Sequence, residues 1–365
     1  MKKNVLFGVL CCVLILALVG CAGEPEIGQT QPSSTQVPTQ ATTQANTQAA
    51  TTAATEPERE LFEVDLTKVS PMILENAEPG VVTAAKSVIK AFLRYETSAA
   101  IEVSGNTQRF LNDMAYVIHC TCPLFSAFAD LDQMSGYDPE TGMVSWAFYA
   151  EKDVFESTVS AFYATVEDYL AAVERTDSEA MRAMLLYYGV IEDLNYDYGL
   201  IGDAYAALSR KEAALRESAY YVLAEKSGIC TNIAQAYLFL CTQAEIPCGT
   251  VLHMGGQGMH MWNVVELDGK NYYCDPTWDA NSSLKHFGIT AADRAAWAGG
   301  YSDREGTMLG ITVPEKYEIG DLRFQTLREK LPVEISQVRP DKAMQTITFE
   351  GYEYQYTFAC GETAQ

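Results

Sequence analysis

The sequence predicts an α+β fold with a helical first half and β strands in the second. Apolar residues recur at helical spacing before residue 195. Asp268-Gly269 joins two apolar runs, 260–267 and 271–275, and such a dipeptide between strand patterns is a strong hairpin signal. A second pair of β patterns flanks Glu350-Gly351. Helices and strands that are segregated along the chain in this way are typical of α+β proteins.

Length and charge limit the function. The chain has 365 residues, which allows two domains or one large one, and 25 Lys+Arg against 48 Asp+Glu give a net charge of −23. A chain this acidic lacks the basic surface that binds phosphate backbones, so we expect no nucleic-acid partner. It is also repelled by anionic lipids, so any membrane attachment has to be covalent or apolar.

The first twenty residues predict such an attachment. Lys2 and Lys3 precede an apolar run over residues 5–19, a pattern typical of an export signal. Leu18-Val19-Gly20-Cys21 then resembles the bacterial lipobox, which implies cleavage before Cys21 and lipidation of its thiol. The alternative is an uncleaved membrane-anchor helix. We therefore expect an extracytoplasmic protein that is lipid-anchored to the bacterial cell membrane.

Residues 21–60 predict a disordered tether. They are rich in Thr, Gln and Ala and have almost no large apolar side chain before residue 61, so they cannot bury enough surface to fold. A flexible coil of this length reaches roughly 35 Å on average. A stiffer, glycosylated stalk remains the alternative.

Residues 61–195 predict a mainly helical N-terminal subdomain with a small strand element. The strand pattern covers residues 142–150, and Asp153 with Glu156 resembles a capping box at the start of a long helix. Asp177 and Ser178 can cap a further helix. The apolar positions that recur at helical spacing in this region are Val81, Val82, Ala85, Val88, Ile89, Phe92, Leu93, Phe155, Val159, Phe162, Val166 and Leu170.

Residues 196–285 contain the chemistry. One helix is expected over 211–223 and a second over 231–242, so Cys230 lies at the start of a helix, where the dipole and unpaired N–H groups favour a thiolate. A lone cysteine at such a place is usually structural. Whether Cys230 is catalytic therefore depends on which residues lie beside it.

The predicted hairpin supplies these partners. If Asp268-Gly269 is a two-residue turn, Leu267 opposes Lys270, and His260 and Asp275 become diagonal neighbours on one face of the sheet, about 7–8 Å apart at the backbone. A shift of one residue would put them on opposite faces. Taken alone, His260 is more readily explained as a structural histidine.

The three motifs together resemble a known family. Gly228-Ile229-Cys230, His260-Met261-Trp262-Asn263 and Asp275-Pro276-Thr277-Trp278-Asp279, in this order, resemble the transglutaminase-like (transglutaminase core) superfamily. The upstream segments Asn195-Tyr196-Asp197-Tyr198 and Ser218-Ala219-Tyr220 suit the same resemblance. Met261 replaces the usual Ala, and Thr231-Asn232 stands where Gln-Gly is common.

The resemblance implies a papain-like core, in which the cysteine helix packs against a sheet that bears His and Asp. It makes Cys230 the nucleophile, His260 the general base and acid, and Asp275 the group that orients the imidazole. The Cys230 N–H is expected to stabilise the oxyanion, with Tyr220 as a second, weaker candidate. Trp262 and Trp278 are expected to pack around these residues.

The predicted activity is cleavage or transfer of amide bonds in a protein or peptide through an acyl-enzyme. Hydrolysis by a cysteine peptidase or amidase is slightly favoured, and transglutaminase-type cross-linking and a non-catalytic binding or assembly module remain open. No cofactor is expected, and a metal site at Cys230, His260 and Cys274 is disfavoured because no C-x-x-C pair is present. The oligomeric state is open.

The remaining residues carry no predicted chemistry. Residues 286–365 are expected to form a loop region and a hairpin around Glu350-Gly351. His253 and His286 are expected to be structural or at the surface, and Cys241 to be a buried thiol. Export permits disulfides among the other cysteines, but their number does not define a connectivity.

Overall fold

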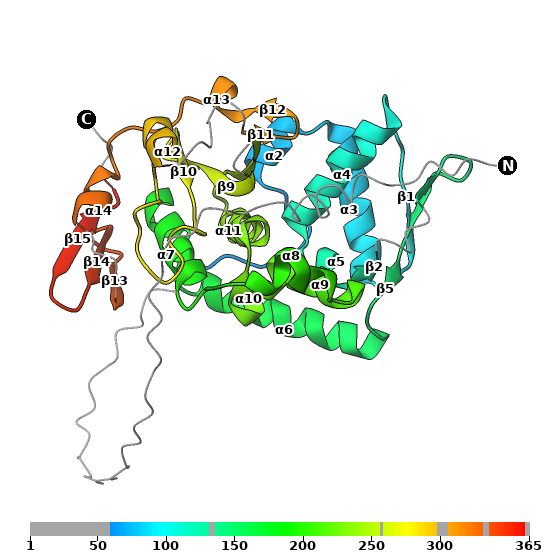
Figure 1. Cartoon of the computed structure of the whole chain (residues 1–365), viewed down its shortest axis with the longest axis horizontal. Coiled ribbons are helices and arrows are strands. Elements are labelled where there is room, and N and C mark those ends of the chain that lie inside the picture. The colour runs from blue at the N-terminus through cyan, green and yellow to red at the C-terminus, as the bar shows by residue number, and fades with distance from the viewer. Residues whose placement is uncertain (1–58, 131–135, 256–257, 298–305, 331–335, 362–365) are drawn as a thin grey trace, which may run out of the picture.

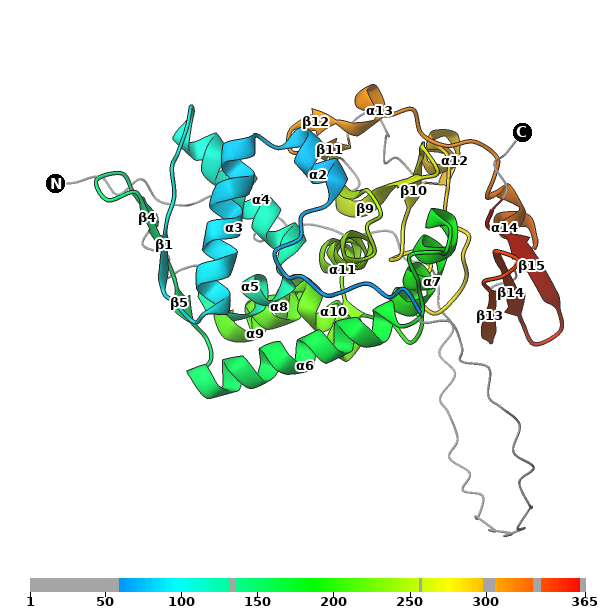
Figure 2. The same cartoon turned by 180° about the vertical axis from the view of Figure 1, so that it is seen from behind.

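The structure is a computed structural model that describes residues 59–130, 136–255, 258–297, 306–330 and 336–361. The predicted signal peptide, Cys21 and nearly all of the predicted tether lie outside these residues. The described chain combines helices with a central sheet, which confirms the α+β class (Figures 1 and 2). None of the helices within these ranges is long and apolar enough to cross a membrane.

Helices dominate the described chain up to residue 191. The predicted stripes are mostly buried: Val88, Ile89 and Phe92 of α3 are fully enclosed, as are Phe155 and Val166 of α6. Leu93 and Val159 are only half-buried. Short strands between them form two small sheets, ordered β1-β4-β3 and β2-β5. The elements are α2 (Pro71–Asn76), α3 (Pro79–Leu93), β1 (Ser98–Ala100), α4 (Thr107–Thr121), α5 (Pro123–Phe128), β2 (Ala129–Asp130), β3 (Gly136–Asp138), β4 (Met143–Ser145), β5 (Ala147–Phe148), α6 (Lys152–Leu170) and α7 (Glu179–Ile191).

Two local predictions in this region are wrong. Helix α6 has Glu151 at its N-cap without a side-chain cap, so the expected capping box at Asp153 is absent. The strand expected over 142–150 is divided at Trp146, whose N–H bonds the Thr97 carbonyl, so β4 and β5 belong to different sheets. The predicted cap of α7 is confirmed, because the Ser178 side chain accepts from the Met181 N–H.

The helix expected over 211–223 is two helices, α9 (Arg210–Arg216) and α10 (Ala219–Glu225). Ser218 caps the second helix by accepting from the Tyr221 N–H at 3.2 Å. The Asn232 amide donates to the carbonyls of Arg216 at 2.8 Å and Ser218 at 3.3 Å. The helix is interrupted here because the Ser218 and Asn232 side chains bond backbone N–H and carbonyl groups that a continuous helix would bond internally.

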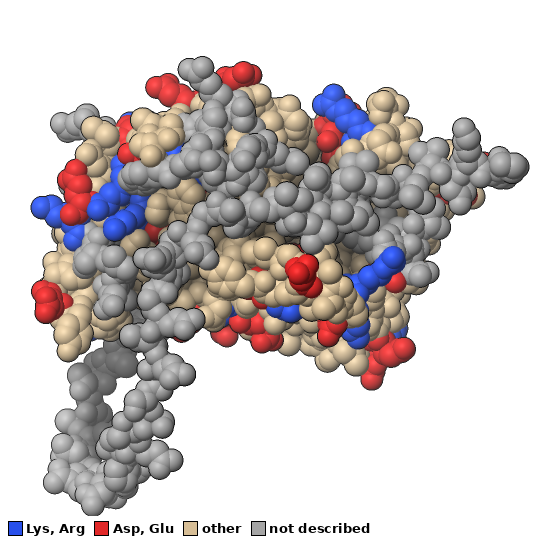
Figure 3. All heavy atoms as spheres, viewed as in Figure 1, with Lys and Arg blue, Asp and Glu red and all other residues tan. Residues whose placement is uncertain are grey.

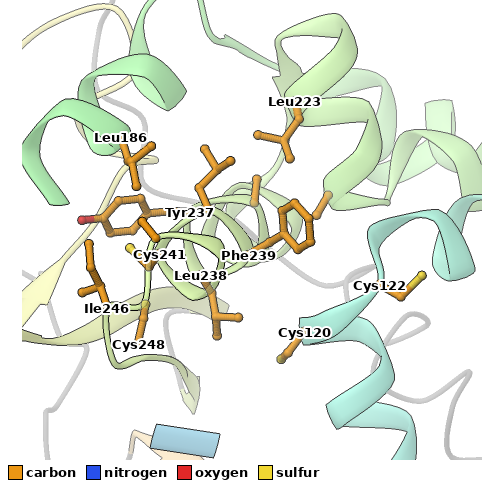
Figure 4. Packing of buried hydrophobic residues seen from close by; sticks show 14 of the residues in the cluster. Cys120, Cys122, Leu186, Leu223, Tyr237, Leu238, Phe239, Cys241, Ile246 and Cys248 are labelled. Atoms are coloured by element: carbon orange, nitrogen blue, oxygen red, sulfur yellow. The ribbon is translucent and has the colours of Figure 1, made fainter. Parts of the chain in front are cut away.

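Helix α11 (Cys230–Gln243) lies at the centre of the molecule, packed on strands β8 and β9 and between helices α7 and α10. Tyr237, Leu238 and Phe239 leave it in different directions, into a core that includes Leu186 and Leu223 (Figure 4). Helix α11 is enclosed almost all round, because helices cover the side that faces away from the sheet.

The central sheet has five strands in the order β10-β9-β8-β11-β12. Its face away from α11 has a second core, which contains Val251, Trp262, Val264 and Tyr273. Both faces of the sheet are therefore covered. The strands are β8 (Cys248–Gly255), β9 (Gly258–Leu267), β10 (Lys270–Cys274), β11 (Thr307–Met308) and β12 (Ile311–Thr312).

The predicted hairpin register is confirmed. Leu267 pairs with Lys270, and Asn263 pairs with Cys274. Asp268 and Gly269 have φ angles of 53° and 79°, the left-handed pair that a type I′ turn requires.

The C-terminal segment contains α12 (Ala291–Trp297), α13 (Val313–Lys316), α14 (Gln325–Lys330) and the sheet β13-β14-β15. The predicted hairpin is confirmed as β14 (Thr346–Glu350) and β15 (Gln355–Ala359), and β13 (Gln337–Asp341) was not predicted. On the face shown in Figure 3, basic and acidic side chains are interspersed. Many charged side chains of the described residues pair, such as Lys270 with Asp321 at 2.6 Å.

Candidate active site

Cys230 is the first residue of α11 and is 2% exposed. The segment that leads to it is fixed by a short parallel pairing of β6 (Asn195–Tyr196) with β7 (Ser227–Gly228). The Asp197 N–H extends this pairing by bonding the Gly228 carbonyl at 2.8 Å. Because the first N–H groups of a helix have no intrahelical partner, the Cys230 side chain lies at the positive end of α11.

Asn232 and Gly228 shape this helix start. The Asn232 Oδ1 atom accepts from the Ile229 N–H at 2.7 Å, while its amide holds the break between α9 and α10. A Cβ at position 228 would lie 2.6 Å from Val222 Cγ2 and 2.8 Å from Asn232 Oδ1, so only glycine fits. The sequence marked Asn232 as a departure from the family pattern but did not reveal its bonds.

His260 and Asp275 form the hydrogen bond that the register implies. His260 Nε2 and Asp275 Oδ2 are 2.7 Å apart, and the two residues are 5% and 0% exposed. Burial alone would raise the pKa of Asp275, but contacts with His260 and Arg294 outweigh it and lower the pKa to about 2. The carboxylate is therefore charged beside the imidazole.

The helix of Cys230 and the strand of His260 are bonded to each other. The Asn263 amide donates to the Ala234 carbonyl at 2.8 Å. Ala234 follows Cys230 by about one helical turn, and Asn263 follows His260 by three residues. This bond holds the start of α11 beside β9, and the catalytic roles of Cys230, His260 and Asp275 remain predictions.

Two tryptophans and an arginine enclose the His–Asp pair. The Trp278 ring stacks on His260 at 5.3 Å and 17°, and the Trp262 ring lies at 5.9 Å and 25°, as predicted. The Arg294 guanidinium lies 4.0 Å from the Trp262 ring and 4.3 Å from the Trp278 ring, and its Nη1 donates to Asp275 Oδ2 at 2.9 Å. The expectation that residues 286–365 carry no chemistry missed this contact. The available signal was a single arginine among the alanines of α12.

A second His–Asp pair lies next to the first. Asp279 is 0% exposed and accepts four hydrogen bonds, of 2.7 to 3.0 Å, from the Tyr187 and Ser283 hydroxyls and from the backbone and Nδ1 of His286. The His286 ring also contacts Trp278 edge-on at 5.1 Å. His286 is thus structural, as one of its two predicted alternatives states.

Tyr220 packs into the helical region. Its ring meets Phe128 and Phe162 edge-on at 5.5 and 5.4 Å, and burial raises the pKa of its hydroxyl. Its oxyanion role remains a prediction.

The seven described cysteines are buried, and none of them forms a disulfide. Burial raises the pKa of Cys120, Cys122 and Cys360 to about 12. Burial also raises the pKa of Cys248 and Cys274. These five thiols are therefore protonated at neutral pH and poor nucleophiles.

Comparison with known proteins places this geometry in a family. Residues 165–276 match the model of the transglutaminase-like superfamily. No curated protein sequence matches the chain.

Three solved structures resemble the chain weakly. One is named as a TGase, with a TM-score of 0.28 and 16% identity over 35% of this chain and 34% of that chain. A proposed cysteine protease from Cytophaga hutchinsonii has a TM-score of 0.24 and 13% identity over 35% of this chain and 43% of that chain. A proposed protease from Parabacteroides distasonis has a TM-score of 0.24 and 12% identity over 38% of this chain and 30% of that chain. The chain spans less than half of each of these proteins, and at these TM-scores the likenesses carry no argument.

The matched range begins inside α6 and ends just after Asp275, so it contains Cys230 and the whole β8–β10 region. Residues 165–276 are therefore similar to the core domain of the transglutaminase-like superfamily.

Proposed function

We propose that this domain is a thiol enzyme that cleaves or transfers amide bonds in proteins or peptides, with Cys230, His260 and Asp275 as its catalytic residues. The observation that carries the proposal is the buried 2.7 Å bond between His260 Nε2 and Asp275 Oδ2, on a strand that is bonded to the helix of Cys230. The family match supports the same reaction class.

The bond assigns a role to each imidazole nitrogen. Because Nε2 faces Asp275, Nδ1 is the nitrogen that accepts the proton from the Cys230 thiol. Asp275, whose pKa is about 2, stays ionised and stabilises the imidazolium that results. Trp278 covers the imidazole and keeps water away from it.

The reaction then balances in two steps. The thiolate of Cys230 adds to an amide carbonyl carbon, and the N–H groups at the start of α11 stabilise the negative oxygen. The C–N bond breaks as the His260 imidazolium gives its proton to the leaving amine. Water or a second amine, deprotonated by His260, attacks the thioester and releases Cys230 as the thiol.

The two outcomes of the second step are hydrolysis and transamidation, and we favour hydrolysis slightly because water is always present. Incubation with a labelled primary amine and glutamine-containing proteins separates them. New N-termini, or release of ammonia without label, indicate hydrolysis, and incorporated label indicates cross-linking. Cys230→Ala is the matched control and should give neither product. If the wild-type chain also gives neither with a broad protein mixture, a binding or assembly module becomes the better proposal.

We also propose that the domain is anchored outside the cytoplasmic membrane through lipidated Cys21. The lipobox pattern and the Thr/Gln/Ala-rich segment over residues 21–60 support this proposal. Labelled palmitate should enter the full-length chain expressed in bacteria and be lost in Cys21→Ala. Equal labelling of both would contradict it.

A further inference from the structure

We propose that Arg294 is a positioning residue of this active site, which holds the Asp275 carboxylate for His260 and sets the pH range in which Cys230 reacts. The proposal rests on the proposed function and adds a fourth residue from outside the matched domain, since the match ends at residue 276 and Arg294 lies on α12.

The first observation is a shared acceptor. Asp275 Oδ2 lies 2.7 Å from His260 Nε2 and 2.9 Å from Arg294 Nη1, so one oxygen serves both partners. A donor on each side of one oxygen fixes the rotation of the carboxylate, and therefore the direction from which it meets the imidazole.

The second observation is the burial of Arg294, which is 0% exposed. A buried guanidinium is retained only where an anion and good geometry compensate for its lost hydration. Here the anion is Asp275, and the faces of Trp262 and Trp278 supply the remaining contact. The same two rings stack on His260, so Arg294 supports the imidazole through the rings as well as through the carboxylate.

The third observation is how α12 is held. Thr290 and Asp293 cap its start, with the Asp293 N–H donating to Thr290 Oγ1 at 3.0 Å. Arg328 of α14 bonds Asp293 Oδ2 at 3.0 Å. The Thr290–Asp293 cap fixes the start of the helix that carries Arg294. Arg328 gives a control, because it is a second cation beside α12 and lies outside the proposed catalytic residues.

The charged and titratable groups around Asp275 come from several elements. They are His253 opposite His260 on β8, Tyr273 on β10, His286 and Asp279 after β10, and Tyr187 on α7. Asp293 and Arg328 lie near Arg294, and Cys230 lies at the start of α11, which is bonded to β9. Within the described residues, Arg294 is the permanent cation that bonds Asp275.

The charge predicts the direction of the effect. Removing Arg294 makes the site more negative, which disfavours the thiolate of Cys230 and favours its protonated form. The pH at which Cys230 reaches half of its maximal alkylation rate should therefore rise. A residue that only fills space would change stability and leave this midpoint in place.

The test is the rate of Cys230 alkylation by iodoacetamide from pH 4 to 10, followed by mass spectrometry of the Cys230 peptide in the whole chain. Arg294→Gln should raise the midpoint by about one pH unit. Arg328→Gln should leave it unchanged. An unchanged midpoint in folded Arg294→Gln, with Cys230 still reactive, overturns the role of Arg294 alone. A wild-type Cys230 that reacts no faster than the other thiols overturns the proposed function instead.

Arg294→Lys keeps the charge but not the planar group that meets both rings and the carboxylate. It should leave the midpoint near that of the wild-type chain and lower the maximal rate severalfold. If Arg294→Gln does not fold, Arg294→Lys tests the proposal on its own. A wild-type alkylation rate and midpoint in Arg294→Lys would show that the guanidinium does not position the site.

Discussion

Two His–Asp pairs contact the same tryptophan, and we propose only one of them as catalytic. Asp275 bonds His260 and Asp279 bonds His286, and both aspartates are 0% exposed. The Trp278 ring lies 5.3 Å from one imidazole and 5.1 Å from the other. The sequence motifs assign catalysis to the first pair, and the pairing of Asp279 with His286 was not predicted.

Their surroundings separate them. Asp279 accepts four hydrogen bonds, from α7 and from its own loop. Its carboxylate therefore links these two segments. The Asp275 carboxylate bonds His260 and Arg294, and the His260 imidazole lies on the strand that is bonded to the helix of Cys230. A catalytic pair is therefore marked by its neighbours and its permanent charge, since the His–Asp bond is common to both.

The largest expected effect is on turnover, with one histidine changed at a time. His260→Ala should lower the rate on a substrate found by the amine and N-terminus assays by about 10³-fold or more, because it removes the general base. His286→Ala should change that rate by less than about tenfold, since its ring bonds Asp279 and contacts Trp278 but has no part in the proposed proton transfer. Losses of equal size would contradict the distinction between the pairs.

The second effect is on stability, where we expect the larger loss at the second His–Asp pair. Asp279→Ala should lower the free energy of unfolding by about 3 kcal/mol, because it leaves buried donors of Tyr187, Ser283 and His286 without their acceptor. Asp275→Asn should cost less stability and more activity. Urea unfolding of both variants measures the difference, and a milder loss for Asp279→Ala would remove its structural role.

Sequence reasoning worked where the contacts are local. The His260–Asp275 bond follows from one turn, Asp268-Gly269, and from strand alternation, because a two-residue loop fixes the register. Helix α11 begins one residue before the helix expected over 231–242. The class of fold followed from such local patterns together with the family resemblance.

Residues brought together by packing could not be predicted in this way. Arg294 reaches Asp275 because α12 folds back over two tryptophans. The spacing of apolar residues along the sequence does not predict such a contact. Asn232 bonds carbonyls of residues 14 and 16 positions earlier, which is also what divides the expected helix over 211–223. The enclosure of α11 depends on helices from distant parts of the chain.

The third effect is on acid stability. Asp275 has its pKa lowered from 3.8 to about 2, so its contribution to stability is present above about pH 4 and is lost as the pH falls through about 2. The shift corresponds to about 2 kcal/mol. Asp275→Asn should flatten the fall of the unfolding free energy over this window. A fall as steep as in the wild-type chain would contradict the assigned charge.

The smallest expected effect concerns the backbone that presents Cys230. Gly228→Ala should lower the free energy of unfolding by about 1–3 kcal/mol, because its Cβ would meet Val222 and Asn232. Gly80→Ala is the matched control, since the nearest atoms to its Cβ lie 3.6 and 3.7 Å away. We expect no loss there. Equal effects in thermal unfolding would show that position 228 is not constrained.

The most direct test of the account is selective alkylation of Cys230 at pH 6. Five other thiols are protonated at that pH, because burial raises each pKa. Iodoacetamide should label Cys230 at least about tenfold faster than these thiols, and His260→Ala should abolish the difference. Labelling of Cys230 that is no faster than that of Cys120 or Cys360, or that persists in His260→Ala, would contradict a thiol enzyme built on Cys230, His260 and Asp275.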